Sequence, residues 1–224
     1  MSVKIITVTK QLPDFFRETS EIIPFLHAWL EGQEERFIRK VIKIFEGANV
    51  ERRYSIMDPI EVFSKTSFED RNQIYKREVI KLGEKVLKSA LEKANWKPTD
   101  LDYIITVSCT GIMIPSLDAF LINKLGLRHN IVRLPVTEMG CVAGISGMIY
   151  ANNFLKSNPN KKVAVVAVES PTATFQLNDF SMANIVSAAI FGDGAACVLL
   201  SSYENENGPK IAAETILAIE KSFN

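Results

Sequence analysis

Cys141 is the residue whose type and position best suit covalent chemistry. It lies in the segment VTEMGCVAGISGMIYANNF, where the pattern of a strand changes to that of a helix. Backbone N–H groups in the first turn of a helix have no partner within the helix, so they favour a thiolate and can stabilise an oxyanion beside it. The sequence therefore makes Cys141 a candidate nucleophile. The alternative is a small, inert core residue, which a free cysteine usually is.

Few other side chains offer comparable chemistry. The chain has three cysteines (Cys109, Cys141, Cys197) and two histidines (His27, His129). Their spacing fits no zinc-binding pattern, so no metal site is predicted. His27 falls on a partly exposed face of the first helical region and His129 in a turn. We therefore expect neither histidine to act as the base for the candidate nucleophile.

Strands and helices that alternate along the chain must position this cysteine. The runs VAVVAV and AACVLL are continuously apolar, which is typical of strands covered on both faces. Strands separated by helices of about 10–15 residues indicate βαβ crossovers and a largely parallel sheet. The expected elements are a strand at 3–8, helices within 22–46 that break near Gly32, a helix that starts at the cap Ser67 and stops before Pro98, strands at 103–107, 131–134, 163–168 and 195–200, helices at 116–125 and 141–155, and a last strand at 211–220.

The helix after the candidate nucleophile is unusually apolar. No charged residue lies between Val142 and Leu155, and Gly144 and Gly147 make the helix thin. A helix that is apolar on all sides is buried on all sides. We therefore expect this helix to lie between two sheets, or between this chain and a partner.

Composition and charge exclude several classes of protein. The 26 basic and 26 acidic residues give a net charge of zero, which argues against a general nucleic-acid-binding protein. An apolar fraction of 47% is ordinary for a globular chain, and no apolar run approaches the ~20 residues that span a bilayer. The first residues resemble a strand rather than a signal peptide. Three cysteines cannot all pair, so we expect reduced thiols and a cytoplasmic location.

Several motifs follow one another in order along the chain: VERRYSI, TGIMIPSLD, LGLR, MGCVAGISG, VAVVAVES and FGDGAACVLL. Together they resemble the condensing enzymes of the thiolase superfamily, and within it the type III polyketide synthases of the chalcone and stilbene synthase family. An ordered set of motifs is far more specific than FGDGAA alone. The resemblance implies an α/β fold, a thiolase-like half with αβα layers and a mixed, mostly parallel sheet, in which the helix after Cys141 is buried as the central layer. Residues 1–224 would form a single N-terminal domain of such an enzyme, without its C-terminal half.

The resemblance also implies roles for individual residues. Cys141 aligns with the family's acyl-accepting nucleophile, and Phe191 with an aromatic gatekeeper near the reactive thioester. Lys40 and Lys43 align with basic residues that bind the phosphates of coenzyme A, whereas a third family cation falls at Gly47. Two cations one helical turn apart suit phosphates physically. Cys109, Thr110, Thr174 and Phe175 fall around the acyl cavity, and Ile114 falls on the loop that crosses to the partner subunit.

The residue types alone leave plainer alternatives open. Without the family, Phe191 is a core residue, and the pair Lys40 and Lys43 is solvated surface. Cys109 and Cys197 are best interpreted as buried structural thiols.

The implied chemistry is acyl transfer followed by decarboxylative condensation. Cys141 attacks an acyl-CoA thioester, and the carbanion left by decarboxylation of malonyl-CoA attacks the acyl group. No cofactor beyond these coenzyme A thioesters is expected. The second step uses a histidine and an asparagine that the C-terminal half of the family supplies. This chain is about half the family's length, so these two donors for the enolate are absent from it.

Three hypotheses remain for the function. The chain is the N-terminal half of an acyl-transferring condensing enzyme, or one partner of a separately encoded C-terminal half, or a non-catalytic half-domain that only binds. A β-ketoacyl-acyl-carrier-protein synthase III-like enzyme of fatty-acid synthesis is the main rival enzyme. Because the helix after the candidate nucleophile would otherwise be left uncovered, we expect a homodimer or pairing with a C-terminal half. We also expect the cysteine at the inner end of a tunnel open to coenzyme A.

Overall fold

A five-stranded sheet forms the centre of the computed structural model, which describes residues 2–64 and 67–211. Along the sheet the strands are β1 (Lys4–Gln11), β7 (Gly194–Ser201), β6 (Lys162–Glu169), β4 (Tyr103–Val107) and β5 (Val132–Val136). β7 is antiparallel to both β1 and β6, whereas β4 is parallel to β5 and to β6. Four of these strands therefore point the same way, and the prediction of a mixed, mostly parallel sheet is confirmed.

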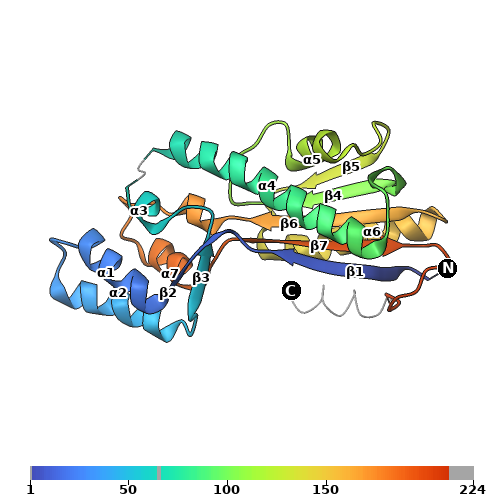
Figure 1. The fold of residues 1–224 in the computed structure, drawn as a ribbon. Coiled ribbons are helices and arrows are strands. Elements are labelled where there is room, and N and C mark those ends of the chain that lie inside the picture. The colour runs from blue at the N-terminus through green and yellow to red at the C-terminus, as the bar shows by residue number, and fades with distance from the viewer. Residues whose placement is uncertain (1, 65–66, 212–224) are drawn as a thin grey trace.

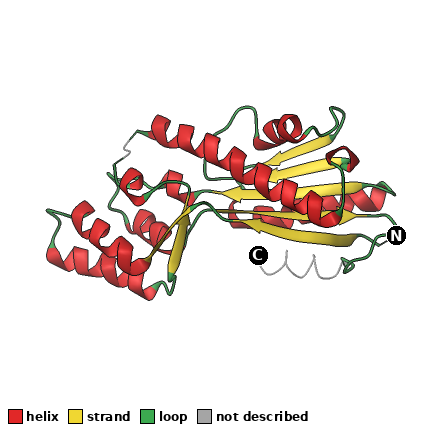
Figure 2. Ribbon diagram, in the orientation of Figure 1, coloured by secondary structure: helices red, strands yellow, loops and turns green. Residues whose placement is uncertain are grey.

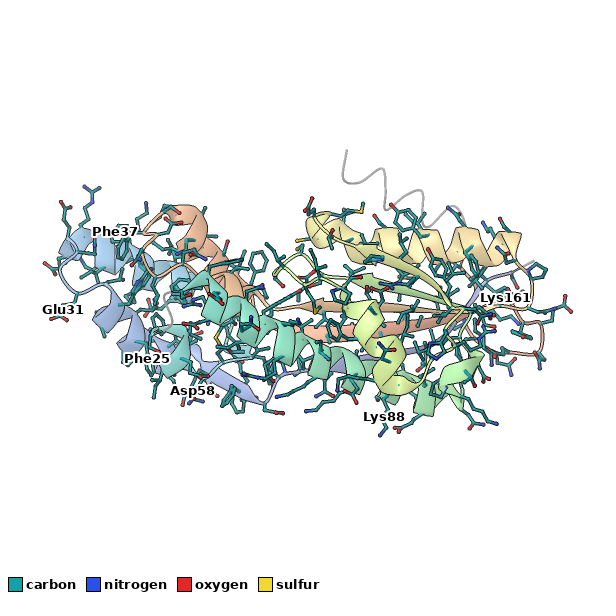
Figure 3. The ribbon with its side chains drawn as sticks, turned by 90° about the horizontal axis from the view of Figure 1, so that it is seen from above. Phe25, Glu31, Phe37, Asp58, Lys88 and Lys161 are labelled. Carbon is teal, nitrogen blue, oxygen red and sulfur yellow. The ribbon has the colours of Figure 1, made fainter. Side chains whose placement is uncertain are left out.

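Helices cover both faces of this sheet. One face packs against the helices α4 (Phe68–Ala94) and α5 (Leu117–Leu125), and the other against α6 (Ala143–Ser157). Figure 3 shows this layering from above, with the strands between α4 on one side and α6 on the other. Ser67 caps α4 as predicted, because its hydroxyl accepts a hydrogen bond from the backbone N–H of Asp70. The αβα arrangement is therefore confirmed.

The helix α6 approaches the sheet closely through its small residues. Ala143, Gly147, Ala151 and Leu155 are buried, and a Cβ on Gly147 would lie 3.0 Å from a methyl carbon of Val165. On the opposite side of the helix, Tyr150 is 39% exposed. Packing against the sheet thus accounts for the apolar residues on one face of this helix. A partner for the other face remains a prediction.

A smaller, mainly helical part lies beyond the carboxyl ends of the parallel strands (Figures 1 and 2). Its helices α1 and α2 confirm the predicted break near Gly32, whereas its two-stranded sheet and α7 were not predicted. Leu26, Leu30, Phe45 and Ile185 are among the side chains that form its own buried cluster. The elements are β2 (Phe15–Glu18), α1 (Thr19–Trp29), α2 (Glu35–Gly47), β3 (Arg52–Ser55), α3 (Pro59–Val62) and α7 (Met182–Ile190), with β2 antiparallel to β3.

Most predicted elements agree with the structure to within a few residues. The predicted last strand at 211–220 lies almost entirely outside the described residues. Three short 3-10 turns complete the described chain, η1 (Pro98–Asp100), η2 (Gly140–Val142) and η3 (Pro171–Thr174). Among the described helices, none is long and apolar enough to cross a membrane.

Candidate active site

A cavity of about 600 Å³ lies between the sheet and the helical part of the molecule. Residues near the carboxyl ends of β4 and β6 line one side of it, among them Val107 and Ala167. This edge of a parallel sheet is where loops converge and where α/β proteins commonly bind ligands. Six of the predicted site residues line this one cavity: Cys109, Thr110, Cys141, Thr174, Phe175 and Phe191.

Cys141 lies in the cavity wall at the junction that the sequence predicts. It is the middle residue of the turn η2, and α6 begins two residues later at Ala143. Its thiol is unpaired and the residue is exposed. Gly140 and Gly144 flank it in the lining, and a Cβ on either glycine would meet nothing within 4 Å. The cysteine is thus accessible from the cavity beside the first turn of a helix.

Cys109 lies in the same cavity, so its prediction as a buried structural thiol is wrong. It follows the end of β4 and is exposed, because the chain leaves the sheet there and enters the loop that lines the cavity. Partial burial and the neighbouring carboxylate of Glu169 raise the pKa of the Cys109 thiol. Cys197 is fully buried in β7 as predicted, and this burial raises its pKa strongly.

Glu169 is a cavity residue that the sequence analysis missed. Its carboxylate accepts hydrogen bonds from the backbone N–H of Cys109 at 3.1 Å and from the Thr110 hydroxyl at 2.7 Å. The Thr110 hydroxyl in turn accepts a hydrogen bond from the backbone N–H of Ser170 at 2.7 Å. Because Glu169 ends β6 and Cys109 follows β4, the parallel pairing of these strands brings them together. Its place as the last residue of an apolar strand is a signal that could have identified it.

Tyr75 supports the same loop from beneath. Its hydroxyl shares a hydrogen bond with the Ser108 hydroxyl at 2.5 Å, and the side chain is 1% exposed. Its ring contacts Gly111 so closely that a Cβ at this position would collide with it. Glycine at 111 therefore lets the loop that carries Cys109 rest directly on the aromatic ring.

Asp193 joins three segments of the cavity wall. Its carboxylate is 3% exposed and accepts hydrogen bonds from the backbone N–H groups of Ile56 (2.8 Å) and Thr172 (2.9 Å) and from the hydroxyls of Ser170 (3.0 Å) and Thr172 (2.7 Å). Burial raises the pKa of this carboxyl, and these four hydrogen bonds oppose that shift by favouring the ionised form. The motif FGDGAA thus contributes a cavity residue, Phe191, and the anchor of the surrounding wall.

Phe191 follows the last residue of α7 and is 43% exposed toward the cavity. Its exposure excludes the alternative that it is an ordinary core residue. Thr174 is also exposed, whereas Phe175 is buried and packs edge-on against Phe63, with ring centroids 5.8 Å apart.

Lys40 and Lys43 lie outside the cavity lining. Both are exposed on α2, on the side opposite the buried Val41 and Phe45, and neither forms an ion pair in the described part of the chain. Since Phe45 itself lines the cavity, α2 separates the two lysines from it. The structure therefore does not bring them to the candidate nucleophile, and a role in phosphate binding stays a prediction.

Neither histidine lines the cavity that contains the candidate nucleophile. His27 is exposed on α1 and His129 is exposed before β5, at the opposite end of the sheet from Cys141. No histidine is among the described residues that line the cavity. Among the described residues, no group of three or more His, Cys, Asp and Glu side chains is arranged to hold a metal ion.

The family model for the N-terminal domain of chalcone and stilbene synthases matches residues 15–203, which cover most of the chain and every cavity residue. The chain belongs to the chalcone and stilbene synthase family. Relatives include the 1,3,6,8-tetrahydroxynaphthalene synthase of Streptomyces coelicolor, 35% identical over 71% of this chain and 42% of that protein. Phloroglucinol synthase of Pseudomonas fluorescens is 31% identical over 80% of this chain and 52% of that protein. The chain thus spans about half the length of these relatives.

Solved structures support the same assignment. The crystal structure of 1,3,6,8-tetrahydroxynaphthalene synthase from Streptomyces coelicolor, a bacterial type III polyketide synthase, superposes with a TM-score of 0.85 at 27% identity. The superposition covers 92% of this chain and 58% of that one. Germicidin synthase from the same organism, with a TM-score of 0.87 at 20% identity, shares the fold. This chain therefore has the fold of the type III polyketide synthases over the part that it covers.

Proposed function

We propose that this chain accepts an acyl group from an acyl-CoA thioester on Cys141, as the first half-reaction of polyketide synthesis. The single observation that carries the proposal is the exposed Cys141 thiol, which lies in a cavity of about 600 Å³ immediately before the first turn of α6. Family membership supports the same chemistry, because the related 1,3,6,8-tetrahydroxynaphthalene synthase is a type III polyketide synthase. It also favours this proposal over a β-ketoacyl-acyl-carrier-protein synthase III-like activity.

The half-reaction balances without a cofactor. The Cys141 thiolate attacks the thioester carbonyl, a new carbon–sulfur bond forms, and coenzyme A leaves as a thiolate that takes up a proton. The attacking and leaving sulfurs are similar in basicity, so the exchange is nearly balanced energetically. Backbone amides of the turn η2, which carries Cys141, would stabilise the oxyanion that forms between these two events.

Condensation with malonyl-CoA requires groups that the described cavity does not supply. An enolate forms when malonyl-CoA loses carbon dioxide, and it needs hydrogen-bond donors close to the acyl group. We propose that a C-terminal half, in this polypeptide or another, provides them. The 39% exposed Tyr150 of α6 and the 87% exposed Ile114 are apolar surface that such a partner or a second copy of the chain would cover. The cytoplasmic location also remains a proposal, in keeping with three free cysteines.

Intact-mass spectrometry of the 224-residue chain tests the first half-reaction. We expect incubation with an acyl-CoA to add the mass of one acyl group and to release one equivalent of free coenzyme A. Malonyl-CoA added afterwards is expected to release no carbon dioxide until a C-terminal half is supplied. If no acyl-CoA adds mass under conditions in which iodoacetamide alkylates Cys141, the proposed acyl transfer is wrong.

Reversal of charge at Lys40 and Lys43 tests where coenzyme A binds. If both lysines contact its phosphates, Lys40→Glu with Lys43→Glu raises the half-saturating acyl-CoA concentration about tenfold or more, because two charge-assisted contacts are lost and repulsion is added. The acyl-N-acetylcysteamine thioester, which has no phosphates, should react with the variant and with the original chain at the same rate.

Lys85→Glu with Lys88→Glu is the matched control, because these lysines have the same spacing on the exposed side of α4. The assignment of phosphate binding to α2 fails if both double variants raise the half-saturating acyl-CoA concentration equally. It also fails if the α2 variant slows the phosphate-free thioester as well.

A further inference from the structure

The cavity continues from Cys141 into the helical part of the molecule. Five side chains line that end, and we call them the apolar arm: Ile22 and Leu26 of α1, Phe45 of α2, Phe63 after α3, and Ala188 of α7. In Figure 1, α1, α2 and α7 lie together, apart from the five-stranded sheet that carries the cysteine. The apolar arm therefore extends away from the candidate nucleophile, toward the buried cluster around Leu26 and Phe45.

On each of two helices, the residues that line the cavity near the arm lie on one face of the helix. Ile22 and Leu26 are four residues apart, so they share one face of α1. On α7, three lining residues follow the same pattern, namely Asn184, Ser187 and Ala188. Two helices thus present continuous faces to one cavity. The arm is consequently part of the packed structure and not a gap beside a single side chain.

An aromatic cluster fixes the position of one wall. Trp29 stacks on Phe180 with ring centroids 5.2 Å apart and contacts Phe175 edge-on at 5.1 Å. Its indole N–H donates a hydrogen bond to the carbonyl of Leu177 at 2.8 Å. Trp29 also contacts the arm residue Phe63, at 6.4 Å between centroids. A hydrocarbon in the arm would therefore lie against rings that are already held in place.

The three charged side chains of the whole lining are bound to protein groups. Arg17 pairs with Asp58 at 3.1 Å. Arg53 donates to the carbonyls of Ala189 and Val50 and to the Thr19 hydroxyl. The third, Glu169, accepts hydrogen bonds at the cysteine end, as described above. The apolar arm therefore offers no free counter-ion to a carboxylate and suits an uncharged hydrocarbon.

We propose that the apolar arm binds the aliphatic tail of the acyl group that Cys141 accepts, so that the preferred starter is a fatty acyl thioester of medium length and neither acetyl nor malonyl. This inference rests on the proposed function, since it names the substrate class of the same site. Each methylene that enters the arm should improve binding about fourfold until the arm is full. The expected preference for decanoyl over acetyl is therefore large.

Two measurements on the 224-residue chain test the proposal. The first is the rate at which acetyl-, hexanoyl- and decanoyl-CoA acylate Cys141, followed by intact mass. The second is equilibrium binding of the same thioesters to the Cys141→Ala variant, followed by the fluorescence of Trp29. The other tryptophan, Trp96, lies at the far end of the sheet, where it donates a hydrogen bond to Glu206. The fluorescence change therefore reports the arm even if no acyl transfer occurs.

Ala188→Phe fills the arm, and Ala183→Phe is its matched control. Both are alanines of α7, but Ala183 is exposed and does not line the cavity. Ile22→Phe fills the arm from the opposite wall and serves as the second variant should Ala188→Phe fail to fold. We expect a filled arm to slow decanoyl transfer at least tenfold and to leave acetyl transfer nearly unchanged, with Ala183→Phe like the original chain.

The outcomes separate the two proposals. Equal acylation rates and equal binding for all three thioesters would show that the arm does not bind the acyl tail. The same conclusion follows if filling the arm slows acetyl transfer and decanoyl transfer equally. If no thioester acylates the chain but decanoyl-CoA still changes Trp29 fluorescence in a manner abolished by Ala188→Phe, the acyl transfer is wrong and the arm stands. If neither acylation nor binding is seen, both proposals fail.

Discussion

Cys141→Ala is expected to abolish acyl-enzyme formation completely, because no second thiol in the chain can replace it. The original chain should gain one acyl mass, and the variant none. Cys109 lies in the same cavity, but its partial burial and the carboxylate of Glu169 raise the pKa of its thiol and so disfavour the thiolate. Cys197 is 0% exposed and cannot meet a thioester. The thiol at 141 is the one that is both accessible and placed before the first turn of a helix.

Two further variants make this result specific. Cys197→Ala should retain full acylation, because that thiol never meets the substrate. Cys109→Ala determines whether the second cavity thiol receives any acyl group, and peptide mapping of the labelled chain locates the adduct directly. An acyl group found on Cys109, or retained in Cys141→Ala, would contradict the assignment of the nucleophile.

The cysteine and the layers around it were predictable because their signals are local. An apolar run with no charge from Val142 to Leu155, and two apolar strands of the right length, specify their own burial whatever their neighbours are. The cap at Ser67 likewise depends on residues three positions apart. Such patterns can be recognised in a single sequence because the interactions that they require lie within one element.

The wall of the cavity was not predictable in the same way. Glu169 and Cys109 are 60 residues apart and meet only because β4 and β6 pair in parallel. The strands β2 and β3 also pair across a long stretch of chain, and neither is long enough to show a clear alternation. Cys109 was misjudged as buried because exposure at the end of a strand depends on where the next loop turns. Single-sequence analysis has no measure of such contacts between distant segments.

Asp193→Asn is expected to destabilise the chain by about 3 kcal/mol, although it changes a single atom of the side chain. Each carboxylate oxygen accepts one backbone N–H, one from Ile56 at 2.8 Å and the other from Thr172 at 2.9 Å. An amide has only one oxygen, so in either orientation its NH₂ group faces a backbone N–H. That donor loses its acceptor inside the protein, which costs about 1–3 kcal/mol, and the charge-assisted hydrogen bonds of the remaining oxygen weaken as well.

Asp179→Asn is the matched control for this prediction. Asp179 also accepts a backbone N–H and a hydroxyl, both from Ser181, but it is exposed, so water can replace what the amide loses. We expect a change below about 0.5 kcal/mol there. Urea unfolding measures the free energy of unfolding of both variants. Equal stabilities for the two would mean that Asp193 does not anchor the wall.

If Asp193→Asn alone is destabilised, its effect should also reach the site. Acylation of Cys141, measured at a temperature where the variant is folded, should then be slower, because Phe191 and Thr172 lose their common support.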